Sequence, residues 1–194
     1  MALDTPTFLA RMPKAELHLH LEGTTAPETL WALASRNNVA LPVSSLVDLR
    51  KLYEFENFMK FVELWLAMCR CFRTEADYQQ LVDDFVAYAA TQNLRYAELH
   101  FTPYNHEITG FGGERALGVV ARRLAEAGRA GGVVTRLILD IPSESIEQSG
   151  PYTAALLERI EVEGVVALRI SIAYARVGAS LFANYDRVGC EVPV

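Results

Sequence analysis

The sequence has few cysteines and no concentration of positive charge. Its 194 residues include three cysteines, Cys69, Cys71 and Cys190, which form no disulfide framework. We expect buried free thiols in a reducing compartment. Lysine and arginine total 18 against 24 acidic residues, which gives a net charge of −6. The basic residues form no cluster, so the electrostatic footprint of nucleic-acid binding is missing and a small-molecule partner is expected.

The sequence also lacks the apolar segments that are typical of secreted and membrane proteins. The opening stretch MALDTPTFLARM contains Asp4 and has neither the basic region nor the long apolar core of a signal peptide. Apolar runs such as GVVALRISIA are interrupted by Arg169, so we expect no membrane span. The glycines of GFGGE are not followed by the Lys-Ser/Thr of a phosphate-binding loop. Together these absences predict a cytoplasmic protein.

The sequence does contain an alternation of strand and helix patterns. Hydrophobic residues make up 51% of the chain, enough for a substantial core. Short apolar segments predict strands at KAELHLHL and at 94–103, 133–142 and 164–172. Between them, apolar residues at helical spacing predict helices, including one up to about Asn37, one along 55–72 and others at 113–130 and 151–163. This order favours βαβ units and a parallel sheet, either a barrel or a doubly wound sheet.

Two threonines are predicted to begin helices. Thr25 precedes Pro27 and has Glu28 three residues later, as in a capping box. Thr74 precedes the apolar stripe that runs from Tyr78 to Ala89. In the preceding helix, aromatic residues recur at helical spacing, which is typical of a buried core and also of a substrate pocket.

The stretch KAELHLHLEG places two histidines one residue apart between two glutamates. Alternate side chains of a strand share one face, so Glu16, His18, His20 and Glu22 would line up together. The other face would be an apolar row of Ala15, Leu17, Leu19 and Leu21, suited to packing against helices. Because buried polar groups need partners, two converging imidazoles predict a site for Zn²⁺ or a similar ion.

The segment MPKAELHLHLEGTTAPETL resembles the first strand and helix of the adenosine/adenine deaminase family, zinc-dependent enzymes with a (β/α)8 TIM barrel. The resemblance continues through FENFMKFVELW and YAELHFTP and, weakly, through LILDIPSES. It covers roughly residues 10 to 168 and implies an α/β fold, here an N-terminal part of the barrel with about four βα units. It also implies two regions, 1–168 within the barrel and 169–194 as a divergent tail.

The resemblance implies a role for several residues. His18 and His20 would bind the catalytic Zn²⁺, and Glu22 would contact the substrate. From the matching stretches, Gly23, Phe58 and Phe61 are further substrate-binding candidates. The family reaction is hydrolytic deamination of a 6-aminopurine, with a zinc-activated water as the nucleophile.

Three other polar residues receive weaker predictions. His100 shares a face of the second strand with Glu98 and lies near a position where some family members carry arginine. We predict that His106 lies in a solvated loop. Asp140, at the end of the third strand, could shape the pocket, but a cap of a loop or helix start is favoured.

The family's remaining catalytic motifs, His-Ala-Gly-Glu and Ser/Asn-Asp-Asp-Pro, are not found in these 194 residues. No catalytic residue is therefore assigned, and we predict a truncated and inactive chain, with a frame disruption near codon 169 as the hypothesis for its origin. Half a barrel would leave open strand edges, which predicts self-association.

Two alternative functions stay open. One is a non-catalytic half-barrel that binds metal or a partner, and the other is a different metal-dependent amidohydrolase. Adenosine, adenine and related aminopurines stay open as substrates.

Overall fold

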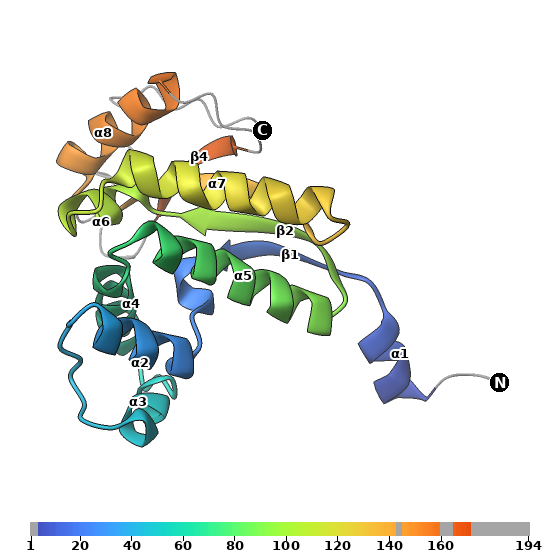
Figure 1. Cartoon of the computed structure of the whole chain (residues 1–194). Coiled ribbons are helices and arrows are strands. Elements are labelled where there is room, and N and C mark those ends of the chain that lie inside the picture. The colour runs from blue at the N-terminus through green and yellow to red at the C-terminus, as the bar shows by residue number, and fades with distance from the viewer. Residues whose placement is uncertain (1–3, 143–144, 160–164, 172–194) are drawn as a thin grey trace.

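The computed structural model describes residues 4–142, 145–159 and 165–171. At its centre is a parallel sheet of four strands in sequence order. The strands are β1 (Lys14–His20), β2 (Leu94–Phe101), β3 (Val134–Pro142) and β4 (Val165–Ser171). Each neighbouring pair is separated in sequence by helices, so the predicted βαβ order and parallel sheet are confirmed (Figure 1).

The helices between β1 and β2 are the most numerous. This connection contains the short 3-10 helix η1 (Glu22–Thr24), α2 (Pro27–Arg36), α3 (Leu46–Leu52), α4 (Phe58–Cys71) and α5 (Glu75–Thr91). Helix α1 (Thr5–Arg11) precedes β1, α6 (Pro103–Ile108) and α7 (Gly113–Arg129) follow β2, and α8 (Ile146–Arg159) follows β3. Figure 1 shows α5 and α7 side by side over the same face of the sheet.

One of the two predicted helix starts is confirmed. Thr74 caps α5 in a capping box, because its hydroxyl accepts from the backbone N–H of Asp77 while the Asp77 carboxylate accepts from the backbone N–H of Thr74. The prediction for Thr25 is wrong. The cap of α2 is Ala26, and the Thr25 hydroxyl donates instead to the carbonyl of Glu22, which closes the 3-10 turn after β1.

The two faces of the sheet differ in chemistry. On β2, the residues Ala97, Leu99 and Phe101 are fully buried in the core beneath the helices. Their neighbours Glu98 and His100 lie on the opposite face, because side chains alternate along a strand. The helix-covered face thus supplies the hydrophobic core, while the opposite face carries the polar residues.

The predicted apolar row of β1 is only partly buried. Leu21 is fully buried and Leu19 packs against the core, but the Leu17 residue is 59% exposed. Ala15 is exposed as well, so the prediction that the whole row packs against helices is wrong at Ala15 and Leu17. Within the described residues β1 pairs only with β2, so β1 is an edge strand with limited helix cover.

Two further sequence predictions can be compared with the fold. Cys69 and Cys71 are buried free thiols, as predicted, whereas Cys190 lies outside the described residues. Residues 172–194, most of the predicted tail, also lie outside them. Among the residues with a described placement, no helix is long and apolar enough to cross a membrane.

Candidate metal and substrate site

Register between the strands brings three histidines and one aspartate to the carboxyl ends of β1, β2 and β3. His20 pairs in register with His100, and His100 pairs with Ile138 on β3. Asp140 lies two residues beyond Ile138, on the same side of the strand. His18 lies two residues before His20, so all four side chains lie on the face away from the helices.

The three histidine rings form a compact cluster. The ring of His18 stacks on that of His100 with centroids 4.3 Å apart, and the ring of His20 lies 5.1 Å from His100 and 5.4 Å from His18. One nitrogen atom from each ring lies within 4.8 Å of the other two. His18 is exposed, His20 is intermediate and His100 is buried, so the cluster is open to solvent on the β1 side.

Asp140 fixes the orientation of the buried member of this cluster. Its Oδ1 lies 2.9 Å from Nδ1 of His100, and both side chains are 1% exposed. Its Oδ2 lies 3.3 Å from Nδ1 of His20, within ion-pair distance but without the alignment of a hydrogen bond. The predicted role of Asp140 as a loop or helix cap is therefore wrong, because its carboxylate is occupied by imidazoles.

The donor set fits a divalent transition metal. Neutral imidazole nitrogen is a ligand of zinc and related ions. Nδ1 of His100 faces the Asp140 carboxylate, and in the neutral tautomer that donates to it Nε2 carries the lone pair. That Nε2 atom is buried and has no hydrogen-bond partner. A buried nitrogen lone pair without a partner beside two further imidazoles is the arrangement that a metal ion would satisfy.

Glu22 lies in the 3-10 turn that follows β1, two residues after His20. Its side chain is fully buried, and Oε1 accepts from the backbone N–H of Thr102 at 3.2 Å and from Nε2 of His106 at 3.1 Å. Burial alone would raise the pKa of Glu22, but His106 and the backbone donors outweigh it and hold that pKa below its usual value. Glu22 is therefore a buried carboxylate, and its Oε2 has no hydrogen-bond partner.

His106 belongs to a chain of hydrogen bonds rather than to a solvated loop. It is fully buried in α6, and its ring stacks on Phe101 with centroids 4.8 Å apart. Its Nδ1 lies 2.9 Å from the hydroxyl of Tyr78, so both ring nitrogens are occupied. The prediction that His106 is solvated is wrong, because α6 folds back against the core and Glu22.

A second group of metal-capable residues fits metal binding less well. Glu22, Cys69 and His106 place one ligand atom each within 4.8 Å of one another, and all three are buried. Burial raises the pKa of Cys69 well above its usual value, which keeps the thiol neutral. With both nitrogens of His106 hydrogen-bonded, this group is a structural network rather than a second metal site.

The other substrate-binding candidates lie on α4 and in the turn. Phe58 is 53% exposed, and its ring centroid lies 5.9 Å from that of Phe61. Trp65, one helical turn after Phe61, lies 6.3 Å from the ring of His20 and has a buried indole N–H without a partner. A Cβ on Gly23 would meet only the Cβ of His20, at 3.8 Å. The structure thus brings Trp65 of α4 to the histidine cluster and pairs Phe58 with Phe61 on the same helix.

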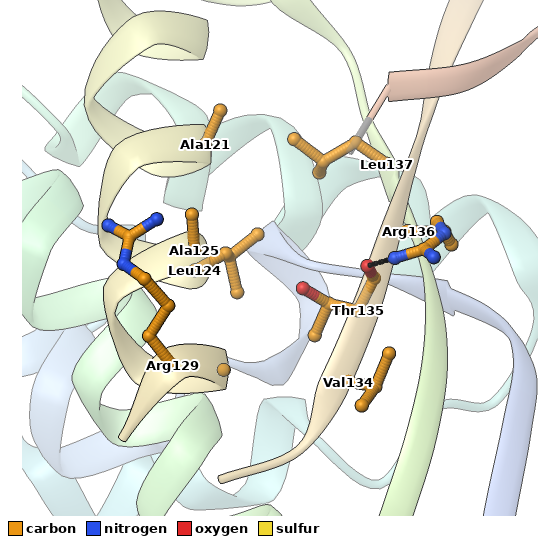
Figure 2. Close-up of a pocket in the computed structure, with 9 residues that line it drawn as sticks. Ala121, Leu124, Ala125, Arg129, Val134, Thr135, Arg136 and Leu137 are labelled. Atoms are coloured by element: carbon orange, nitrogen blue, oxygen red, sulfur yellow. Dashed lines mark hydrogen bonds between the residues drawn. The ribbon is translucent and has the colours of Figure 1, made fainter. Parts of the chain in front are cut away.

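A separate pocket lies at the other end of the sheet. Figure 2 shows it between α7 and the first residues of β3, lined by Ala121, Leu124, Ala125, Gly128, Arg129, Val134, Thr135, Arg136 and Leu137. Its volume is about 250 Å³. Its lining contains no histidine, cysteine or carboxylate. Because active sites of parallel α/β folds gather at the carboxyl ends of strands, this pocket is not the candidate site.

Sequence reasoning placed His18 and His20 but missed their neighbours. His100 lies near the carboxyl end of β2, the neighbour of β1, and Asp140 lies near the carboxyl end of β3, the next strand along the sheet. Polar residues at the carboxyl ends of successive strands are a signal that could have grouped them. The partner of His106 could not be found in this way, because the Glu22–His106 contact joins residues 84 positions apart. No local pattern in the sequence marks that contact.

Comparison with known proteins identifies the family. The family model described as "Adenosine deaminase" matches residues 13–189. The chain belongs to the adenosine deaminase family. The match extends beyond residue 168, where the resemblance was expected to end, so the boundary between the predicted regions 1–168 and 169–194 stays a prediction.

Relatives and solved structures agree with this assignment. The chain is 39% identical over 165 residues to an adenine deaminase of Streptomyces coelicolor, covering 81% of this chain and 47% of that protein. It is 39% identical over 131 residues to an adenine deaminase of Ralstonia nicotianae, covering 68% and 38%. A crystal structure of adenine deaminase from Arthrobacter aurescens superposes with a TM-score of 0.81 at 31% identity, covering 91% of this chain and 54% of that one.

A more distant structure supports the fold. It is an amidohydrolase from Burkholderia ambifaria with bound Zn, and it superposes with a TM-score of 0.81 at 21% identity, covering 97% of this chain and 52% of that one. The chain thus spans about half the length of its relatives. The prediction of an N-terminal part of a TIM-barrel deaminase fold is confirmed.

Proposed function

We propose that this chain is the N-terminal part of a zinc-dependent deaminase that hydrolyses the 6-amino group of an aminopurine. The observation that supports it most is the histidine cluster at the carboxyl ends of β1 and β2, followed in the turn after β1 by the buried carboxylate of Glu22. His18 and His20 would hold the zinc. The ion, when bound, lowers the pKa of a water molecule toward neutrality and so supplies the nucleophile.

The surrounding residues would bind and orient the purine. Glu22 has an unpaired Oε2, which can accept a hydrogen bond from a ring N–H, while His106 and Thr102 hold Oε1 in place. Gly23 leaves room beside His20. Phe58 and Phe61 present aromatic faces that can cover a flat heterocycle and exclude water from it.

Adenine is the substrate that we propose first. Relatives described as adenine deaminases share 31% to 40% of their residues with this chain over the matched segments. A free base needs no ribose pocket. Adenosine and other 6-aminopurines are the comparison substrates for the assay.

We further propose that the 194 residues alone bind zinc without turnover. The two family motifs that supply further ligands and the proton donor are not found in them. A positive test therefore joins residues 1–168 to the part of the Streptomyces coelicolor adenine deaminase that follows its matched segment. We expect the zinc-loaded chimaera to release ammonia from adenine, and His18→Ala or His20→Ala to abolish that release.

The matched control for the chimaera is Glu98→Gln. Glu98 lies on β2, and its carboxylate accepts from the hydroxyl of Tyr96 rather than from a histidine. This variant should keep ammonia release within about twofold of the parent chimaera, because a partly exposed charge outside the site contributes little. A folded, zinc-loaded chimaera without activity on any aminopurine would contradict the proposed reaction. Ammonia release by the 194-residue chain alone would contradict the proposed inactivity.

A second function, as a half-barrel that binds another chain, is favoured by one observation. Leu17 is 59% exposed on an edge strand. Exposed apolar strand edges tend to pair with other chains. In this second function the half-barrel would form a stable complex with another chain and would bind zinc, but neither the complex nor the chain alone would catalyse deamination.

A further inference from the structure

We propose that Asp140 is a positioning residue of the site, because its carboxylate lies between Nδ1 of His20 and Nδ1 of His100 and so decides which nitrogen of each ring stays open. This inference rests on the proposed function of the site. It keeps His18 and His20 as the zinc ligands that β1 supplies. It adds a residue from β3, which acts through the ligands and does not touch the ion.

The first argument is the unpaired oxygen atom of Asp140. The side chain is 1% exposed, and its Oδ1 lies 2.9 Å from Nδ1 of His100. Its Oδ2 is also buried but has no hydrogen-bond partner among the described residues. A buried carboxylate oxygen without a donor is unfavourable. Nδ1 of His20 lies 3.3 Å from Oδ2, and the His20 side chain is 28% exposed, so a small rotation of this ring can align the missing hydrogen bond.

The second argument is the effect of this carboxylate on the imidazole of His20. A neutral imidazole carries its proton on one ring nitrogen, and the hydrogen bond that one nitrogen makes decides the state of the other. When Nδ1–H donates to Asp140, Nε2 of His20 carries the lone pair that a metal ligand needs. Histidines that bind zinc commonly donate their other N–H to a carboxylate in this way. Asp140 therefore prepares His20 for the ion before the ion is bound.

The third argument is the place of His100 between Asp140 and His18. The rings of His100 and His18 are stacked, with centroids 4.3 Å apart and an angle of 13° between their planes. The in-plane nitrogens of two stacked rings do not converge on one ion, so the contribution of His100 is its ring face. The His100 side chain is 1% exposed and held at Nδ1 by Asp140, so its fixed ring limits the planes that His18 can adopt.

A purely structural His100–Asp140 pair is the alternative, and the contacts of His106 show what such a pair looks like. Nε2 of His106 lies 3.1 Å from the Glu22 carboxylate, and its Nδ1 lies 2.9 Å from the Tyr78 hydroxyl. Both nitrogens of that ring therefore have protein partners. Nε2 of His100 has none, and the second oxygen of Asp140 faces His20. The pair formed by His100 and Asp140 thus belongs to the site, whereas His106 belongs to the core.

The test reads the tautomer of His20 directly. Long-range nitrogen NMR correlations of the metal-free 194-residue chain, at about pH 8 where ordinary imidazoles are neutral, distinguish a proton on Nδ1 from one on Nε2. We expect His20 and His100 of the wild type to carry the proton on Nδ1. Asp140→Asn replaces one acceptor oxygen by an NH₂ donor, so only one ring can keep its acceptor. We expect the buried His100 to keep it and His20 to change to the Nε2 proton.

Zinc affinity, measured in competition with a chromophoric chelator, is the second readout. Asp140→Asn should bind zinc about 10- to 100-fold more weakly than wild type, as when other histidine ligands lose an outer carboxylate. Glu98→Gln is the matched control, because it removes the same charge from the same face of the sheet. The Glu98 carboxylate accepts from the Tyr96 hydroxyl and contacts no histidine ligand, so this variant should stay within about twofold of wild type.

Each outcome decides the proposal. A proton on Nε2 of His20 in the folded wild type would overturn it, and so would a His20 tautomer that Asp140→Asn leaves unchanged. Equal losses of zinc affinity in Asp140→Asn and Glu98→Gln would assign the effect to charge alone and would also overturn it.

The wild-type tautomer needs no variant, so the test stands even if Asp140→Asn does not fold. The tautomer is also read without metal. A proton on Nδ1 of His20 that moves in Asp140→Asn, together with an inactive zinc-loaded chimaera, would sustain this inference and contradict the proposed deaminase function. The failure of one proposal is therefore distinguishable from the failure of the other.

Discussion

At the scale of single residues, the site depends on which imidazole nitrogens are already bonded. Glu22 is an ionised carboxylate because hydrogen bonds outweigh the effect of burial on its pKa, so Nε2 of His106 must donate to it. Nδ1 of His106 then accepts from the hydroxyl of Tyr78. Burial raises the pKa of Tyr78, which keeps that hydroxyl protonated as a donor.

The Tyr78 hydroxyl is expected to stabilise this chain of hydrogen bonds. Tyr78→Phe removes the donor and leaves Nδ1 of His106 buried without a partner, so the free energy of unfolding should fall by about 1–3 kcal/mol. Urea denaturation at neutral pH measures the change. The matched control is Tyr88→Phe on the same helix, because the Tyr88 residue is 56% exposed and should change stability by less than about 0.5 kcal/mol. Equal effects of both variants would contradict the assignment of donor and acceptor.

At the scale of elements, Asp77 joins the start of α5 to the end of α2. Its Oδ2 accepts from the backbone N–H groups of Arg73 and Thr74 and from the Asn37 amide, and Oδ1 pairs with the Arg36 guanidinium. Burial raises the pKa of Asp77, but these donors outweigh it and lower the pKa below the ordinary value of 3.8. The folded state therefore binds this proton less tightly than the unfolded state.

This difference predicts a dependence of stability on pH. The contribution of Asp77 is fully present above its unfolded-state pKa of about 4 and is lost as the pH falls through its lower folded-state pKa. Above pH 5, Asp77→Asn should lower the free energy of unfolding by about 1–2 kcal/mol, as for a lost helix cap, and the difference from wild type should shrink below pH 4. Denaturant melts between pH 3 and pH 7 measure it, with the exposed Asp83→Asn as control. If the difference in free energy of unfolding between Asp77→Asn and wild type grew toward low pH, this prediction would be contradicted.

Gly113 allows three helices to meet at the carboxyl end of the sheet. It begins α7, and a Cβ at this position would collide with the carbonyl of Pro103 in α6 and the hydroxyl of Tyr152 in α8. Gly113→Ala should therefore lower the free energy of unfolding by about 1–3 kcal/mol, as in other overpacked sites. Gly118→Ala, in the same helix with nothing within 4 Å, should instead raise it by up to about 1 kcal/mol. Thermal melts compare the two, and a stabilised Gly113→Ala would show that the three helices do not pack this closely.

At the scale of the whole molecule, the exposed edge of β1 is the clearest feature of a part-barrel. We expect the chain to self-associate at micromolar concentration, because an edge strand with an exposed leucine offers unpaired backbone groups and apolar surface. Leu17→Lys should shift the molecule toward monomer in sedimentation velocity experiments, since edge lysines oppose strand pairing. Val47→Lys, a change of an equally exposed residue on α3, should leave the distribution unchanged. A wild-type chain that stays monomeric at micromolar concentration would contradict this prediction.

The fold was largely predictable from the sequence because its signals are local. The strand predicted at 94–103 is observed at Leu94–Phe101, and the one predicted at 133–142 is observed at Val134–Pro142. The site was predictable only where its residues share one motif, as His18 and His20 do. Asp140 and His106 acquire their partners through strand register and the return of α6, which depend on contacts 40 and 84 residues apart.

Zinc binding by the 194-residue chain is the most direct test of this account. Metal content after dialysis, compared between wild type and the His18→Ala/His20→Ala double variant, should show about one zinc per wild-type chain and almost none in the double variant, with both chains folded by circular dichroism. A folded wild type without zinc, or a double variant that keeps it, would contradict the claim that the ends of β1 and β2 form a metal site.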